Sequence, residues 1–285
     1  MAEEGGYLVV PQSVLEIFGT GLSFLFSKQY FVLFLPFLLL SVLEWLFLIF
    51  FPSLRLNDLA LTGFLPLKVS FLGLITFFGY LLAIGIDTSI VADELLGIET
   101  SLGKGYEKVF EVFRELLVGS FLVALLVFSP MFIVLFPLSF LQKKLGEFAI
   151  INLDNSTINL LGILGLVCFA LQVIFLIWFC LTPVCIVLEK NRAINAMNKS
   201  RELTRGNWFH VLGVIFLISV IFSITSSAAS FIGKFVNGSF AGTLLGPFAF
   251  LVETIISNLV GPISVGMLVA LYFDLLARKP YLKSL

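Results

Sequence analysis

Four polar side chains lie inside long apolar runs of the sequence. Three are carboxylates, Glu44, Asp87 and Glu253, and the fourth is the amide Asn258. An ionisable group at the centre of a bilayer costs about 2.5–3.5 kcal/mol on insertion scales, so it normally faces a protein interior or water. Glu44 and Glu253 fall at similar depth, so the first hypothesis is that they share a cavity, a cation or a proton. The alternative is that each carboxyl group is protonated or singly hydrogen-bonded, with a structural role.

Three further carboxylates each close an apolar run in a similar setting. The runs end in Ile-Val-Ala-Asp93, Ile-Val-Leu-Glu189 and Leu-Tyr-Phe-Asp274. A carboxylate at a helix C-terminus meets the negative end of the helix dipole, which costs about 0.3–1 kcal/mol unless a donor compensates. We therefore expect each acid to be paired with a nearby amphipathic helix, with Arg201 and Arg205 as the best-suited cations. The predicted role is structural, and a ligand site is the alternative.

The chain lacks the usual signatures of catalysis and metal binding. His210 is its only histidine, and it has no His/Asp/Glu metal spacing, no G-x-S-x-G motif and no glycine-rich phosphate loop. Cys168, Cys180 and Cys185 share one apolar run, where they are expected to be small buried apolar side chains. No catalytic residue, cofactor or metal site is therefore predicted. The net charge of −1 argues against a nucleic-acid surface.

Membrane-crossing helices must position these polar groups. Of the 285 residues, 59% are hydrophobic and 12% charged, and the mean hydropathy is +1.10, which indicates a polytopic membrane protein. A helix needs about 20 apolar residues to cross the hydrocarbon core, where its backbone must satisfy its own polar groups. The fourth and sixth runs exceed this length, so they should tilt, kink or project. One all-α domain over 1–285 is predicted, with spans at 30–51, 67–91, 117–141, 158–188, 208–233 and 244–273.

The lysines and arginines predict the orientation of these spans. With the N-terminus inside, twelve of the 17 basic residues fall on the inner side, and the outer side keeps Arg55, Lys68, Lys143, Lys144 and Lys234. We therefore predict a multi-pass protein of the cell membrane with both termini in the cytoplasm. No cleavable signal peptide is expected, because the first residues are acidic and the first apolar run is too long.

Three amphipathic segments are predicted to lie along the cytoplasmic face of the membrane. The first, 13–27, opens with the capping-box pattern Ser13-x-x-Glu16. The second, 100–116, keeps the apolar spacing of one helix face opposite charged residues. The third, 192–205, is followed by Gly206, a residue suited to a helix C-terminus.

The order of spans and amphipathic segments recurs. Span two, segment 100–116 and span three resemble span four, segment 192–205 and span five, at a period of about 95 residues. Span six, segment 13–27 and span one complete a third unit if the order is closed into a ring. This predicts a pseudo-threefold arrangement of helical hairpins. The alternative is that the three terminal acids share a setting by chance.

The second half of the chain carries a recurring pattern of residues over about 180–278. Its positions are Pro183, Glu189, Ala196, Ser200, Leu203, Gly206, Trp208, Tyr272, Phe273, Asp274, Leu275 and Arg278. The pattern resembles the membrane domain attached to some glycerophosphodiester phosphodiesterases, and the related YciC-like integral membrane proteins. The resemblance implies six spans and a prokaryotic cell membrane but no activity. No soluble phosphodiesterase domain is present, so that hydrolysis does not carry over to this chain.

These observations favour a non-catalytic membrane protein that works by binding. The first hypothesis is a lipid-contacting scaffold or partner-binding component, whose partners are membrane lipids and either another protein or a second copy of the chain. The second is a transporter or channel with a carboxylate site between the first and last spans. The third is an intramembrane lipid enzyme. A polar cavity at Glu44 or Glu253 would favour transport, and a sealed, phenylalanine-packed interior would favour the scaffold.

Overall fold

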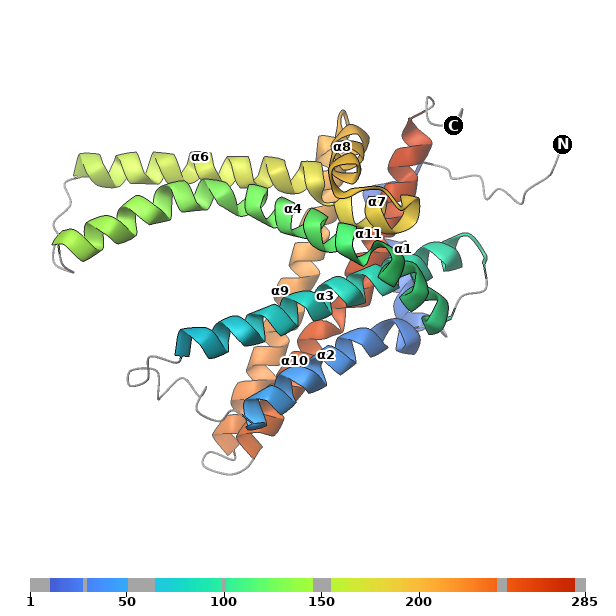
Figure 1. The fold of residues 1–285 in the computed structure, drawn as a ribbon, viewed down its shortest axis with the longest axis horizontal. Helices are drawn as coiled ribbons and strands as arrows, with labels where there is room; N and C mark the ends of the chain where they lie inside the picture. The colour runs from blue at the N-terminus through green and yellow to red at the C-terminus, as the bar shows by residue number, and fades with distance from the viewer. Residues whose placement is uncertain are drawn as a thin grey trace.

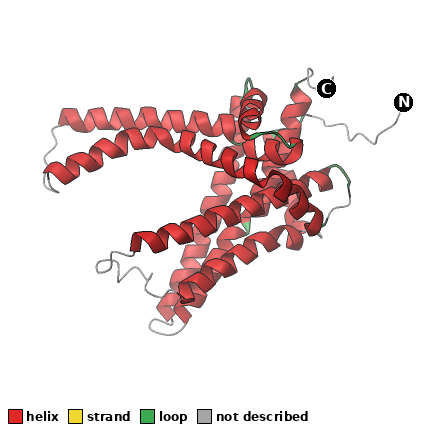
Figure 2. Cartoon of the chain, in the orientation of Figure 1, coloured by secondary structure: helices red, strands yellow, loops and turns green. Residues whose placement is uncertain are grey.

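The computed structural model describes residues 11–27, 30–50, 65–98, 101–145, 155–239 and 245–279, and every regular element in them is a helix (Figures 1 and 2). The helices are α1 (Val14–Ser23), the 3-10 helix η1 (Phe24–Phe26), α2 (Tyr30–Phe50), α3 (Leu65–Leu95), α4 (Leu102–Leu145), α6 (Asn155–Phe179), α7 (Thr182–Glu189), α8 (Ala193–Thr204), α9 (Trp208–Ser239), α10 (Leu245–Asn258) and α11 (Val260–Arg278). The predicted all-α class is confirmed for these residues. The ends of the first and sixth predicted spans, at 51 and 244, lie outside them.

Five helical segments are long and apolar enough to cross a membrane. A sixth is added if α1 and α2, which meet at an angle of 82°, are counted as one bent span. A sharp bend of this kind is what an interfacial helix followed by a crossing helix would show. The capping box predicted for the start of α1 is present, because Ser13 and Glu16 bond each other's backbone N–H groups.

The predicted boundary between 100–116 and 117–141 is wrong, because one continuous helix of 44 residues, α4, covers both segments. At 1.5 Å per residue it is about 66 Å long, roughly twice the thickness of a hydrocarbon core. The periodicity on either side of residue 117 continues in phase, and periodicity alone does not distinguish one helix from two. Of the apolar side chains expected on one face of 100–116, Val109 and Leu116 are buried, whereas Phe110 is 62% exposed.

The two longest predicted spans are each interrupted. The fourth divides into α6 and α7, with Pro183 in the first turn of α7. The sixth divides into α10 and α11 at Leu259, just before Gly261-Pro262. Proline removes a backbone donor and clashes with the preceding turn, so it is accommodated where a helix begins. The excess length of these spans is therefore taken up by breaks.

The core sits at one end of the molecule. Three antiparallel pairs, α2/α3, α4/α6 and α9/α10, extend from it in different directions, and they converge where α1, α7, α8 and the C-terminus of α11 lie (Figure 1). We call this the junction end. Its fully buried side chains come from six helices and include Ile17, Ile90, Leu116, Ile186, Leu203, Leu271 and Leu275.

Burial is unequal among the long helices. Of the apolar window in each, 61% is buried in α3 and 67% in α10–α11, against 17% in α4, 17% in α6–α7 and 11% in α9. Helices α3, α10 and α11 therefore pack within the chain, while most of the apolar window of α4, α6 and α9 faces outward.

Candidate functional site

The first of the three helix-end acids, Asp93, pairs with the start of α4. Lys108 Nζ donates to both carboxylate oxygens of Asp93, at 2.8 and 2.7 Å. Asp93 lies in the last turn of α3, where its charge meets the negative end of the helix dipole, and Lys108 supplies the compensating positive charge. The pair ties the end of α3 to the first turns of α4.

The second acid, Glu189, ends α7 and contacts two other elements. It accepts hydrogen bonds from the Tyr272 hydroxyl of α11 and from Asn191 Nδ2, the latter at 2.6 Å. Lys199 Nζ of α8 lies 3.8 Å from the Glu189 carboxylate. The carboxylate therefore joins α7, α8 and α11.

The third acid, Asp274, is the most enclosed, with a side chain that is 0% exposed. It accepts hydrogen bonds from the backbone N–H of Gln12 at 2.6 Å and from Arg278 Nε at 2.9 Å. His210 Nε2 lies 2.9 Å from its second oxygen. Arg278 also donates to the Gln12 carbonyl. This cluster holds the segment before α1, the end of α11 and the start of α9 together.

Each of the three acids thus has a basic partner within 4 Å and lies beside an amphipathic helix or the residue that leads into it. Arg201 and Arg205 are not among the donors, so this part of the expectation is wrong. Lys199 and Arg201 are two positions apart on α8 and face different sides of it. The side that faces Glu189 therefore carries Lys199, and Arg201 contacts Trp178 instead.

The intramembrane glutamates contact different neighbours. Glu44, buried on α2, accepts a hydrogen bond of 2.7 Å from Thr76 Oγ1 of α3. Glu253 of α10 packs on Gly233 of α9, where an added Cβ would lie 2.8 Å from Glu253 Oε2. Although α2 and α10 pack together, no hydrogen bond or ion pair joins the two carboxylates in the described residues. A site shared by Glu44 and Glu253 therefore stays a prediction.

Asn258 lies in a hydrogen-bonded cluster at the break between α10 and α11. It accepts from the Tyr80 hydroxyl and donates to Ser41 Oγ at 2.8 Å. The Tyr30 hydroxyl donates to the carbonyl of Leu259 at 3.1 Å. These bonds connect α2 and α3 to the interrupted helix and supply partners for polar groups that lipid would leave unsatisfied.

Asp87 is the most isolated of the predicted intramembrane groups. Its side chain is fully buried in α3, and neither carboxylate oxygen has a hydrogen-bond partner among the described residues. The hydroxyls of Thr88 and Ser89, next in the chain, are also buried without a side-chain partner there. Sequence reasoning selected Asp87, but no cluster with Glu44 or Glu253 forms around it.

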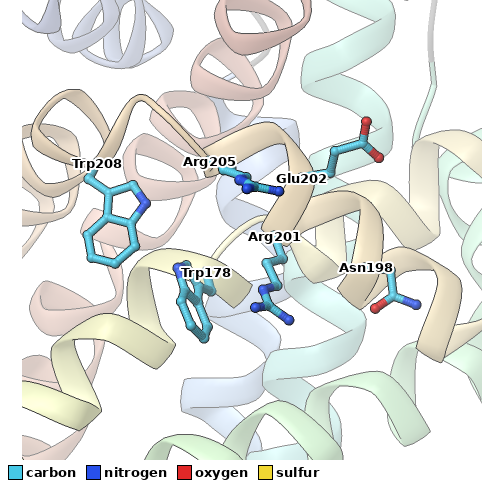
Figure 3. Close-up of a pocket in the computed structure, with 6 residues that line it drawn as sticks. All are labelled: Trp178, Asn198, Arg201, Glu202, Arg205 and Trp208. Atoms are coloured by element: carbon cyan, nitrogen blue, oxygen red, sulfur yellow. The ribbon is translucent and has the colours of Figure 1, made fainter.

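An open pocket of ≈ 470 Å³ lies beside α8 (Figure 3). Three elements form this α8 pocket: Trp178 comes from the end of α6, Trp208 from the start of α9, and the others from α8 and its C-cap residue Arg205. Its lining residues are Trp178, Asn198, Arg201, Glu202, Arg205 and Trp208. The two indole rings meet edge to face with centroids 5.9 Å apart, and the Arg201 guanidinium carbon lies 4.4 Å from the Trp178 ring centroid.

Sequence reasoning missed this pocket. Arg201 and Arg205 were assigned to other partners, and Trp178 is 30 residues from Trp208. A usable signal was present, because both tryptophans flank the only strongly basic amphipathic segment between two spans, the arrangement typical of a membrane interface.

A family model described as Domain of unknown function (DUF7847) matches residues 13–275. The chain belongs to this family. No curated protein and no solved structure matches the chain. The match to DUF7847 includes the three helix-end acids, the polar cluster at Asn258 and the α8 pocket.

Membership of DUF7847 assigns no chemistry to these residues, so their geometry is what indicates the interactions they could make. Among the described residues, no group of three or more His, Cys, Asp or Glu side chains could hold a metal ion. The described residues form three polar features: ion-paired acids at helix ends, a buried polar cluster at the break between α10 and α11, and the basic, aromatic α8 pocket at the junction end.

Proposed function

We propose that this DUF7847 protein is a non-catalytic membrane scaffold that works by contacting lipid. The observation that carries the proposal is the low burial of the apolar windows of α4, α6 and α9. An apolar helix left uncovered by its own chain needs lipid or another protein against it. The ion-paired acids support a scaffold, because they fix helix ends where a transport mechanism would need them to move.

The outward-facing side chains have the character of a lipid-contacting surface. Phe128 of α4, Phe169 of α6 and Phe231 of α9 are all more than half exposed. The hydrocarbon core offers no hydrogen-bond partners, so the side chains that a helix exposes to it must be apolar. The bulky phenylalanines meet this condition. Lipid is the first partner proposed for these faces, and a protein or a second copy of the chain is the alternative.

The proposed orientation places the junction end in the cytoplasm of a prokaryotic cell. Lys108, Lys199, Arg278 and Lys279 lie there, as the positive-inside rule requires. The described ends of the chain also meet there, since Gln12 bonds Asp274, which agrees with an even number of crossings. The resemblance of 180–278 to a membrane domain that accompanies phosphodiesterases agrees with a supporting role.

A transporter is the second candidate, favoured by the broken helix α10–α11 and its polar cluster. Interrupted helices at membrane depth form the binding sites of many transporters. A cavity of ≈ 170 Å³ beside the break includes Tyr80 and Asn258 among its lining residues, but neither Glu44 nor Glu253. Phe37 and Phe222 also line it, so its lining is mostly apolar.

Spin labels on single cysteines test lipid contact directly, with Cys168, Cys180 and Cys185 replaced by alanine. Labels at Phe128, Phe169 and Phe231 in liposomes should collide often with oxygen and rarely with a water-soluble nickel chelate. The matched buried positions on the same three helices, Val109, Ile177 and Val214, should be shielded from both. Shielding of the exposed set from oxygen would mean that protein covers these faces, and the lipid-contacting role would be lost.

Flux measurements separate the scaffold from the transporter. Liposomes containing the wild-type protein and a pH-sensitive dye should show no proton or cation flux above empty liposomes. Flux that is lost in Asp87→Asn or in Glu44→Gln/Glu253→Gln would instead establish the transporter.

A further inference from the structure

We propose that the α8 pocket binds the phosphate group of an anionic phospholipid, with Arg201 and Arg205 as the phosphate ligands and the two tryptophans bordering the headgroup. This deepens the scaffold function proposed above and rests on it for the identity of the lipid. Neither the family match nor the sequence pattern assigns a ligand to these residues.

The two arginines are placed to receive an anion. Arg201 is in the last turn of α8, and Arg205 is the residue that caps it, with its backbone N–H bonded to the Arg201 carbonyl. At this spacing of four residues their side chains leave the same side of the helix end. In the described part of the chain, neither guanidinium forms an ion pair with a carboxylate. Glu202 lines the same pocket, but its carboxylate points away from the tryptophans, whereas Arg201 points toward Trp178 (Figure 3).

Trp178 holds the Arg201 guanidinium in an orientation that suits phosphate binding. Stacking of the guanidinium on the indole face, at 4.4 Å, leaves the N–H groups at its edge free to donate. A planar guanidinium with free edge donors binds phosphate through two parallel hydrogen bonds, and these charge-assisted bonds are among the stronger ones in proteins. Asn198, one turn before Arg201, adds an amide donor to the pocket wall.

The surroundings of the pocket are positively charged. Lys279 Nζ donates to the backbone carbonyl of Glu202, the residue after Arg201. Partial burial lowers the pKa of Lys279, and the nearby charges of Arg205 and Lys199 lower it further, against an opposing effect of Glu202. A bound anion would relieve the repulsion among these cations.

The position of the pocket favours a lipid over a soluble phosphate. Tryptophan concentrates at the level of the headgroups, where its ring is apolar and its N–H is polar. Phe209 follows Trp208 on α9 and is 91% exposed, so an apolar surface begins next to the basic one. Basic pockets of this kind between membrane helices are typical headgroup sites. A phosphate at the guanidinium groups would leave the acyl chains beside Phe209 and α6.

The experiment uses the full chain in nanodiscs of dioleoylphosphatidylcholine with 10% dioleoylphosphatidylglycerol, and counts retained lipids by native mass spectrometry. In the wild type, the ratio of anionic to neutral lipid among the retained molecules should be at least ten times the ratio in the disc. Arg201→Gln/Arg205→Gln should lose this preference, and Trp178→Leu should weaken it severalfold. The matched control Arg114→Gln/Arg192→Gln removes the same charge outside the pocket and should leave the preference unchanged.

Further measurements separate the possible failures. Equal retention in Arg201→Gln/Arg205→Gln and wild type would overturn the pocket, and equal loss in the control would reduce the effect to general surface charge and overturn it too. Saturable binding of inorganic phosphate that needs both arginines, without preference for the anionic lipid, would overturn the lipid as the source. Arg201→Lys/Arg205→Lys keeps the charge but not the planar donors, so it should fall between wild type and the glutamine variant.

Spin labels in the same discs test the scaffold function independently of the pocket. Oxygen accessibility of labels at Phe128, Phe169 and Phe231 should not change in Arg201→Gln/Arg205→Gln. Loss of the anionic lipid with unchanged oxygen accessibility supports the pocket. If the pocket is selective but the labels on α4, α6 and α9 are shielded from lipid, the pocket proposal is supported and the scaffold proposal is contradicted.

Discussion

Individual carboxylates hold the junction end together, and their environments differ. Asp274 is fully enclosed by donors, whereas the Lys108 partner of Asp93 is 41% exposed. The sequence predicts the three acids, because each ends an apolar run in a similar setting. It does not predict Lys108 or Gln12 as their partners, because loop geometry, which no periodicity encodes, brings these residues into place.

Replacing Asp274 by asparagine should destabilise the fold strongly. The substitution removes the charge opposite Arg278 and one of the two acceptor oxygens, while Arg278 and the Gln12 N–H stay in place. Breaking a buried pair costs about 3–5 kcal/mol. Unfolding in mixed detergent micelles, followed by circular dichroism, measures the loss. Glu107→Gln, on the exposed side of α4, should change the free energy of unfolding by less than about 0.5 kcal/mol. Equal effects of the two substitutions would contradict the buried cluster.

At the scale of the element, the helices follow the apolar runs closely, and the discrepancies lie at their junctions. Residue spacing predicts which stretches are helical, because it reports the face of each helix. It does not report whether the chain bends at residue 117, and α4 runs through that position. The breaks at Pro183 and Gly261-Pro262 have a signal in the sequence, because proline acts on the backbone locally. The threefold relation among the hairpins stays a prediction.

The buried face of α4 gives a test at neighbouring positions. Val109→Ser should cost about 2–4 kcal/mol, because Val109 is fully buried against α3 and the new hydroxyl has to be satisfied. Phe110→Ser, one residue later and largely exposed, should stay within about 1 kcal/mol. Thermal unfolding in detergent measures both variants. A larger loss for Phe110→Ser than for Val109→Ser would contradict this buried face of α4.

The close approach at the start of α11 gives a second test. A Cβ at Gly261 would lie 2.6 Å from the Phe37 ring, so Gly261→Ala should destabilise by about 1–3 kcal/mol. Gly162→Ala on α6 meets no atom within 4 Å and should be neutral or stabilising by up to about 1 kcal/mol, because alanine favours helix. Retained thermal stability in Gly261→Ala would show that Phe37 has room to move.

At the scale of the whole molecule, composition predicts a membrane protein with an all-α fold, and both agree with the structure. Composition does not predict where the core lies, because the spans are apolar around most of their circumference and polar side chains mark few of their faces. The buried residues at the junction end come mainly from α3, α4, α7 and α11, and the short helices α1 and α8 pack against them. The α8 pocket was missed for the same reason, since its walls come from three separate elements.

The orientation is testable with single cysteines in a cysteine-free background. Cysteines at Lys104 and Arg201 should resist a membrane-impermeant maleimide in intact cells and react after lysis, because the basic residues favour the inner side. Cysteines at Asn57, Ile150 and Asn237 should react in intact cells; the first two positions lie outside the described residues. Labelling of Arg201 but not Asn237 from outside would reverse the orientation.

The bond between Gln12 and Asp274 means that the path of the chain closes on itself at the junction end. Residues 262 positions apart in sequence therefore lie as close as neighbours in a turn. A short linker from Lys279 to Pro11 would span the gap, and new termini could be opened in a connection far from the core. Such a circular permutant would keep the same buried contacts while changing which hairpin is synthesised first, so the order of membrane insertion becomes separable from the final fold.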